Sequence, residues 1–116
     1  MIETFSALRA IMQPIAESLN VTIDVPGHYS VETSHVMKNG KRLWFGGVQV
    51  KKHYVSYHLM PVYVNPQLLA GISPALKKRM QGKSCFNFKA VDATLFGELE
   101  RLTGSALVDY RASGYV

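Results

Sequence analysis

The chain has 116 residues, 47% of them hydrophobic and 18% charged, which is the size and composition of one globular domain with a single hydrophobic core. Its net charge of +5 favours anionic partners. The basic residues are dispersed, however, and lack the dense run of a nucleic-acid-binding arm, which argues against nucleic acid as a partner.

Membrane and disulfide signals are absent from the sequence. No uncharged apolar stretch approaches the roughly 20 residues that cross a bilayer, and the N-terminus lacks the basic and apolar regions of a secretory leader. Cys85 is the only cysteine, so no disulfide can form within the chain. We therefore expect a cytoplasmic protein that does not enter a membrane.

The N-terminal segment has helical periodicity. Apolar residues recur three or four positions apart and predict one apolar stripe of a helix: Phe5, Leu8, Met12, Ile15 and Leu19. Pro14 interrupts this stripe, because proline has no N–H to donate to the carbonyl four residues back. We expect either a kink or a second short helix that starts at Pro14.

The middle of the chain alternates apolar and polar residues as strands do. Two strands are predicted at 21–25 and 29–35, and two more at 42–50 and 54–60. Asn39-Gly40 is a strong turn signal between the second and third, because both residues tolerate a positive φ. The simplest interpretation is a meander of antiparallel strands.

Turn and cap residues divide the C-terminal half. Asn65-Pro66 and Ser73-Pro74 each predict the start of a short helix, and Gly82 is expected to end the second one in a left-handed conformation. Residues 84–89 predict a strand that closes the sheet, and Asp92 predicts the N-cap of a final helix that Gly104 interrupts. In that strand Phe86 and Phe88 should share one face, and Cys85 and Asn87 the other.

This order of elements defines a fold class. It predicts a single α+β domain over residues 1–116, in which a central, mostly antiparallel sheet is packed by the N-terminal and C-terminal helices. Gly46-Gly47 lies inside a predicted strand, where the missing side chains permit a bulge or the close approach of another group.

The four histidines lack a metal-binding spacing. His53 and His58 are five residues apart, and His28 and His35 are seven apart. Residues an odd number apart on a strand point to opposite faces, so neither pair can chelate one ion unless a bulge or loop intervenes. We expect no metal and no cofactor.

Catalytic signals are weak. Cys85 would be a nucleophile only if a histidine lay beside it and Lys83 or Lys89 stabilised its thiolate. A lone cysteine beside two core phenylalanines is more often part of the packing. Glu98 and Glu100 lie on different faces of the last helix and form no acid/base pair. The sequence therefore favours a protein that is not an enzyme.

Aromatic, glycine and basic residues coincide on the neighbouring middle strands. Ordinary cross-strand packing accounts for the aromatic residues. The alternative is a cleft or sheet face that holds an anionic small molecule or a protein partner. Its candidate ligand-binding residues are Arg42, Trp44, Lys52, His53, Tyr57 and Lys83.

Three segments of the chain resemble the bacterial YdhG-like family of domains of unknown function. They are residues 42–46, residues 51–57, and residues 82–89 ahead of Asp92. The resemblance covers roughly residues 5 to 111 and implies a compact α+β domain in which terminal helices pack a central antiparallel sheet. It implies no agreed catalytic residues.

Some relatives in that family are linked to a frataxin-like fold and to intracellular iron delivery. Frataxin-like proteins perform this role with acidic surface residues, whose oxygens are hard ligands for iron. This chain departs from that pattern, because its first helix has only Glu3 and Glu17 and its net charge is positive.

The sequence supports three hypotheses. The preferred one is a non-enzymatic binding module for an anionic small molecule or a protein partner. The alternatives are an iron carrier and a cysteine-dependent enzyme that uses Cys85. A homodimer that pairs through the edges of an open sheet is a further expectation.

Overall fold

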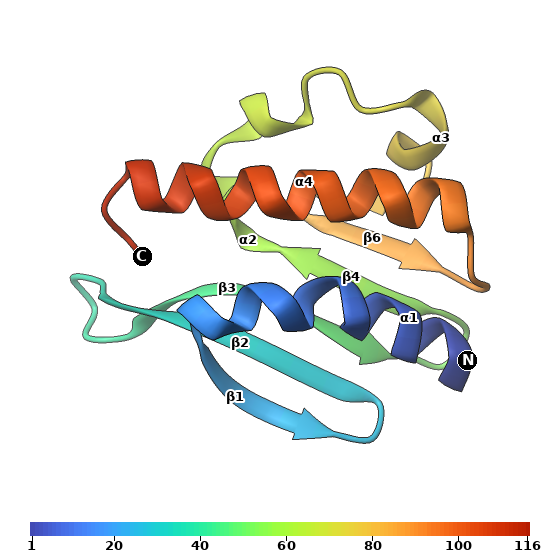
Figure 1. Ribbon diagram of the computed structural model, residues 1–116, viewed down its shortest axis with the longest axis horizontal. Coiled ribbons are helices and arrows are strands. Elements are labelled where there is room, and N and C mark those ends of the chain that lie inside the picture. The colour runs from blue at the N-terminus through green and yellow to red at the C-terminus, as the bar shows by residue number, and fades with distance from the viewer.

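The computed structural model describes residues 1–116 and shows two layers (Figure 1). Six strands form one antiparallel sheet in the order β1-β2-β3-β4-β6-β5. The helices α1 (Ile2–Met12) and α4 (Ala93–Ala112) lie over one face of this sheet and leave the opposite face without a long helix. The predicted α+β class, with its central antiparallel sheet and its terminal helices, is confirmed.

The N-terminal helix changes type at the predicted interruption. The α-helix ends at Met12, and a 3-10 helix, η1 (Gln13–Ser18), continues the chain through Pro14. Phe5, Leu8 and Met12 are buried against the sheet and α4. The apolar stripe of the sequence is therefore the face by which α1 joins the core.

The predicted meander is confirmed. Its four strands are β1 (Asn20–Val25), β2 (His28–Val36), β3 (Arg42–Val50) and β4 (Val55–Leu59), each antiparallel to the next. Asn39-Gly40 forms the turn between β2 and β3, where Gly40 has a φ of +82°. Strand alternation then places one side-chain set under the helices and the other on the open face.

Three short helices connect β4 to the edge of the sheet. They are α2 (Met60–Val64), η2 (Pro66–Leu69) and α3 (Pro74–Lys77). The two predicted caps are present, since the Asn65 side chain accepts a hydrogen bond from the Gln67 amide and the Ser73 hydroxyl accepts one from the Leu76 amide. Helix α3 is tied to α4 by the Glu98 carboxylate, which accepts hydrogen bonds from the amide and the hydroxyl of Ser73, each at 2.6 Å.

Two expectations for the C-terminal half are wrong. Gly82 is left-handed, with φ +77°, but it does not end a helix: α3 ends at Lys77, and Gly82 lies in the turn between β5 (Met80–Gln81) and β6 (Cys85–Phe88). Helix α4 also runs unbroken through Gly104, because its buried side chains on both sides of Gly104 pack on the sheet. Tertiary packing outweighs the modest helix penalty of one glycine.

The core lies between the sheet and the two long helices. Phe86 and Phe88 of β6 point into it, as expected, and Cys85 and Asn87 occupy the opposite, open face. No helix is both long enough and apolar enough to span a bilayer. The open face of the sheet and the short β5–β6 hairpin lie outside this core (Figure 1).

Candidate functional site

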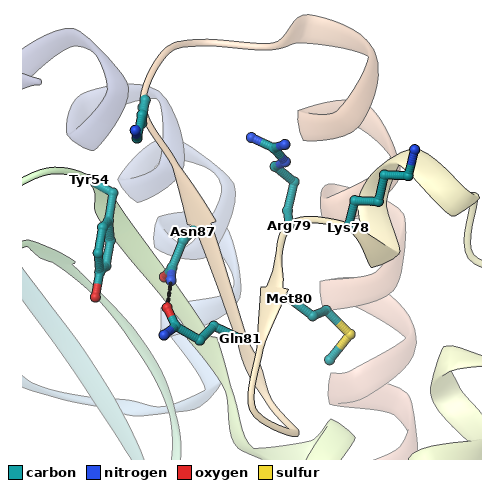
Figure 2. Close-up of a pocket in the computed structure, with 7 residues that line it drawn as sticks. Tyr54, Lys78, Arg79, Met80, Gln81 and Asn87 are labelled. Atoms are coloured by element: carbon teal, nitrogen blue, oxygen red, sulfur yellow. Dashed lines mark hydrogen bonds between the residues drawn. The ribbon is translucent and has the colours of Figure 1, made fainter.

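The β5–β6 hairpin forms one wall of a hollow of about 300 Å³ at the edge of the open sheet face (Figure 2). We call it the basic hollow. Its wall side chains are mostly basic or polar: Tyr54, Lys78, Arg79, Met80, Gln81, Asn87 and Lys89. In Figure 2, Gln81 and Asn87 point toward the side on which Tyr54 lies, and Met80 points away from it. The hollow is open to solvent and is as large as the smaller sites for small molecules.

The local fold fixes two of the cations beside the hairpin. Capping by Ser73 and complete burial of Leu76 anchor α3, so Lys78 and Arg79 follow its last turn at the surface. The Arg79 carbonyl then accepts a hydrogen bond of 2.8 Å from the backbone N–H of Asn87. This bond holds Arg79 beside β6, and Lys89 directly follows the end of that strand.

The positive charge of the basic hollow has no counter-charge among its wall residues. Lys78, Arg79 and Lys89 are exposed, and no carboxylate lines the hollow with them. The two ion pairs of the protein lie elsewhere: Arg9 with Asp24 at 2.9 Å and Arg42 with Glu32 at 3.7 Å. Three like charges around one depression attract an anion and repel each other without it.

Lys78, Arg79 and Lys89 also line a neighbouring hollow of about 350 Å³. It extends along β6 to the beginning of α4 and includes Asp92, whose carboxylate is already engaged by the Leu95 amide at 3.0 Å. The three cations thus form a ridge between two depressions. An anion in either depression would contact the same charges.

Neutral hydrogen-bonding groups complete the floor of the basic hollow. The side-chain amide of Asn87 has a partner on each side. Its Nδ2 donates to Gln81 Oε1 at 2.6 Å, and its Oδ1 accepts from Cys85 Sγ at 3.3 Å. The Gln81 amide nitrogen and the Tyr54 hydroxyl make no hydrogen bond within the protein, so both are free to donate to a ligand.

The open face continues from this hollow along a strip in which Trp44 is the largest side chain. A bulge between β2 and β3 places Trp44 and Gly47 on the same face, and the indole lies across Gly47. Trp44 Nε1 donates to Ser30 Oγ at 2.9 Å, and its ring centroid is 5.4 Å from that of His58. The bulge and the close approach that Gly46-Gly47 permits are both present.

Cys85 and His58 are direct partners in the register of β6 and β4. The geometry that a catalytic cysteine needs is therefore partly met, but the electrostatics oppose it. Burial raises the pKa of the Cys85 thiol, with smaller opposing effects of the Ser56 hydroxyl and Lys51. Burial, assisted by the charge of Lys51, lowers the pKa of His58. Near neutral pH the pair is therefore a protonated Cys85 thiol beside an uncharged His58 imidazole. A protonated thiol is a weak nucleophile.

The six residues proposed from the sequence do not line one cleft. Tyr57 points to the helical side, is fully buried, and shares a hydrogen bond of 2.6 Å with Thr103. Arg42 begins β3 and pairs with Glu32, whereas Lys52 and His53 are in the turn beyond the other end of that strand. Trp44 lies on the open face, and Lys83 lies in the β5–β6 turn beside Tyr63. The structure brings none of the six into the basic hollow.

The residues of the basic hollow were visible in the sequence only as scattered charges. Lys78, Arg79 and Lys89 come together because the β5–β6 hairpin folds two segments against each other. A two-residue strand such as β5 has no recognisable alternation, so the sequence did not predict the hairpin. The Lys77-Lys78-Arg79 run was the one available signal.

Comparisons with known proteins give no match to a family model, to a curated protein or to a solved structure. The resemblance to the YdhG-like family, and the iron role that it implies, therefore stay predictions. Within the chain, no group of three or more His, Cys, Asp or Glu side chains is arranged to hold a metal ion.

Proposed function

We propose that this protein is a non-enzymatic binding module whose ligand is a small anion with at least two negative charges, held in the basic hollow. The observation that carries this proposal is the placement of Lys78, Arg79 and Lys89 around one depression with no carboxylate among its wall residues. Arg79 supplies a planar fork suited to phosphate or carboxylate oxygens.

The neutral groups fit the same ligand. The free Gln81 amide nitrogen and the Tyr54 hydroxyl can donate hydrogen bonds to anion oxygens, and neither needs to break an internal bond first. The Asn87 amide is fixed between two partners and keeps the Gln81 side chain in place. A site whose donors are already oriented loses less entropy when the ligand binds.

Isothermal titration calorimetry with pyrophosphate tests the proposal. We expect binding to the wild type that weakens as the salt concentration rises, because the attraction is screened. In the double variant Arg79→Gln/Lys89→Gln the dissociation constant should rise at least about tenfold, which is the smallest loss expected for a charge-assisted hydrogen bond. Both substitutions keep long polar side chains at exposed positions.

The matched control is Lys38→Gln/Lys41→Gln. It also removes two positive charges, but from the exposed β2–β3 turn, away from the basic hollow. Pyrophosphate affinity should change less than about twofold there, as expected for distant charges in salt. Equal losses in the two double variants would show attraction by net charge alone and would overturn the assigned site. If pyrophosphate does not bind to the wild type, the proposal of an anionic ligand is overturned and a protein partner is favoured.

The expected homodimer stays a prediction, and β1 is the edge where it would form. This strand pairs only with β2, and Val21, Ile23 and Val25 are exposed on it (Figure 1). An edge strand with unpaired backbone groups is a template for pairing with another strand. Sedimentation equilibrium of the wild type and of Ile23→Lys measures it.

A further inference from the structure

A third hollow lies beside the β5–β6 turn, between that turn and the α2–η2 segment. Its volume is about 450 Å³. Only Met80 is shared with the basic hollow, so the two depressions have separate walls. We call it the α2 hollow, and its main wall residues are Val62, Tyr63, Leu69, Lys77, Met80 and Lys83.

The inner part of the α2 hollow is apolar. Val62 is fully buried, and Leu69 and Met80 are half-buried. Tyr63 stands at its side with 56% of its surface exposed, which is a large exposure for an aromatic side chain that lines a cavity. Covering the exposed parts of Tyr63, Leu69 and Met80 with an apolar ligand would remove hydrocarbon surface from water, at about 25 cal/mol per Å².

The rim of the α2 hollow is positively charged. Lys77 and Lys83 are exposed, neither forms an ion pair, and no acidic residue lines the cavity. Lys83 Nζ lies 5.9 Å from the centroid of the Tyr63 ring, so the ammonium group is next to the apolar surface rather than remote from it. An apolar floor and a cationic rim thus occur within one cavity.

We propose that the α2 hollow binds a small amphipathic carboxylate, with an aliphatic or aromatic body and one anionic head. The body packs on Leu69 and Met80 along the Tyr63 ring, and the carboxylate pairs with Lys83 and Lys77. A compact polar anion would leave the apolar floor in water, and a neutral hydrocarbon would gain nothing from the two ammonium groups. This site is independent of the anion proposed for the basic hollow.

Octanoate, octanol and octylamine separate these contributions, because they share one chain and differ in the charge of the head. Two-dimensional ¹H–¹⁵N NMR titrations of the wild type locate and quantify binding. We expect octanoate to shift the amide signals of Tyr63, Leu69, Met80 and Lys83, to bind at least about fivefold more tightly than octanol, and to outcompete octylamine, since one ion pair supplies about 1 kcal/mol at the surface.

The variant Lys77→Gln/Lys83→Gln removes the cationic rim and keeps the apolar floor. Octanoate should bind about fivefold or more weakly to it, whereas octanol affinity and pyrophosphate affinity should stay within about twofold. The control is again Lys38→Gln/Lys41→Gln, which should leave octanoate affinity unchanged. Unfolding of either variant would be seen in the same spectra.

Three results would overturn the proposal. The first is no octanoate binding to the wild type, and the second is octanoate shifts confined to residues outside the α2 hollow. The third is equal affinity for octanoate and octanol, which would define an apolar patch without recognition of the head group. Loss of pyrophosphate binding with intact octanoate binding, in Arg79→Gln/Lys89→Gln, would confirm that the two sites are separate.

Discussion

The Trp44 indole packs against the backbone at Gly47. The indole Cζ2 is 3.1 Å from the position that a Cβ at Gly47 would take, and the Tyr29 carbonyl oxygen is 2.7 Å from it on the neighbouring strand. The absence of a side chain at Gly47 therefore lets Trp44 pack on the open face, donate a hydrogen bond to Ser30 and lie beside the His58 ring, to which it is tilted. This one contact organises the centre of the face that carries no helix.

The variant Gly47→Ala should be destabilised. Its methyl group would press on the Tyr29 carbonyl, which is backbone and can move little, and on the Trp44 ring. We expect a loss of about 1–3 kcal/mol in the free energy of unfolding, as for other overpacked sites. Urea denaturation measures it, and Trp44 is the only tryptophan, so its fluorescence reports the site directly. An unchanged emission spectrum and midpoint would contradict the packing described.

The variant Gly104→Ala should have the opposite effect. Gly104 lies inside the unbroken α4, its φ is not in the left-handed region, and a Cβ there meets no atom within 4 Å. Alanine is favoured over glycine in a helix by roughly 0.5–1 kcal/mol, so the free energy of unfolding should rise by about that amount. A lower melting temperature would show that α4 depends on the glycine.

The variant Tyr57→Phe separates core packing from ligand binding. It removes the hydrogen bond with Thr103, whose hydroxyl retains its bond of 2.8 Å to the Leu99 carbonyl. The expected cost is about 0.5–1.5 kcal/mol, because one neutral hydrogen bond is lost without leaving a second group unpaired. Pyrophosphate affinity should be unchanged. Weaker binding with an unchanged melting temperature would place Tyr57 at a site after all.

Protonation of His58 should destabilise the folded protein at mildly acidic pH. Its pKa is lowered by burial, so the unfolded chain binds a proton on this residue more readily than the folded one. The stabilisation is fully present above the unfolded pKa of about 6.5 and is lost as the pH falls through the folded pKa. Melting temperatures between neutral pH and pH 5 measure this loss, and His58→Gln should reduce it. An unchanged slope in the variant would assign it to other groups.

Cys85 should react slowly with thiol reagents at neutral pH. Burial raises the pKa of its thiol, and this leaves less thiolate than an ordinary cysteine would have. The measurement is the rate of labelling by a chromogenic disulfide in the native protein and in urea. Lys51→Ala should slow the native rate further, because the charge of Lys51 opposes the rise in pKa. Native labelling faster than in urea would restore the hypothesis of a cysteine-dependent enzyme.

Local patterns predicted most of the fold. The spacing of Phe5, Leu8 and Met12, the alternation along the strands and the Asn39-Gly40 turn are all read from neighbouring residues, and each corresponds to an element of the structure. The errors at Gly82 and Gly104 have one cause: a glycine has several uses, and only the surrounding packing decides among them.

The candidate site was less predictable, because it depends on contacts between distant segments. A backbone hydrogen bond joins Arg79 and Asn87, and the periodicity of the sequence does not predict it. Lys89 lines the same hollow because β6 ends directly before it. Tyr57 was proposed for the site but is buried in the core. Alternation along β4 shows which residues share a face with Tyr57, but it does not show which of the two faces is buried. The sequence therefore did not predict which residues the structure brings together around the basic hollow.

The position of β5 at the end of the sheet has a consequence for amide exchange. This strand has two residues and a neighbour on one side only, so its hydrogen bonds should open more readily than those of β3, which is paired on both sides. Both proposed ligands would contact this hairpin. Occupancy of either hollow would then appear first as slower deuterium uptake at β5 and β6, which makes the least protected edge of the molecule its most sensitive reporter.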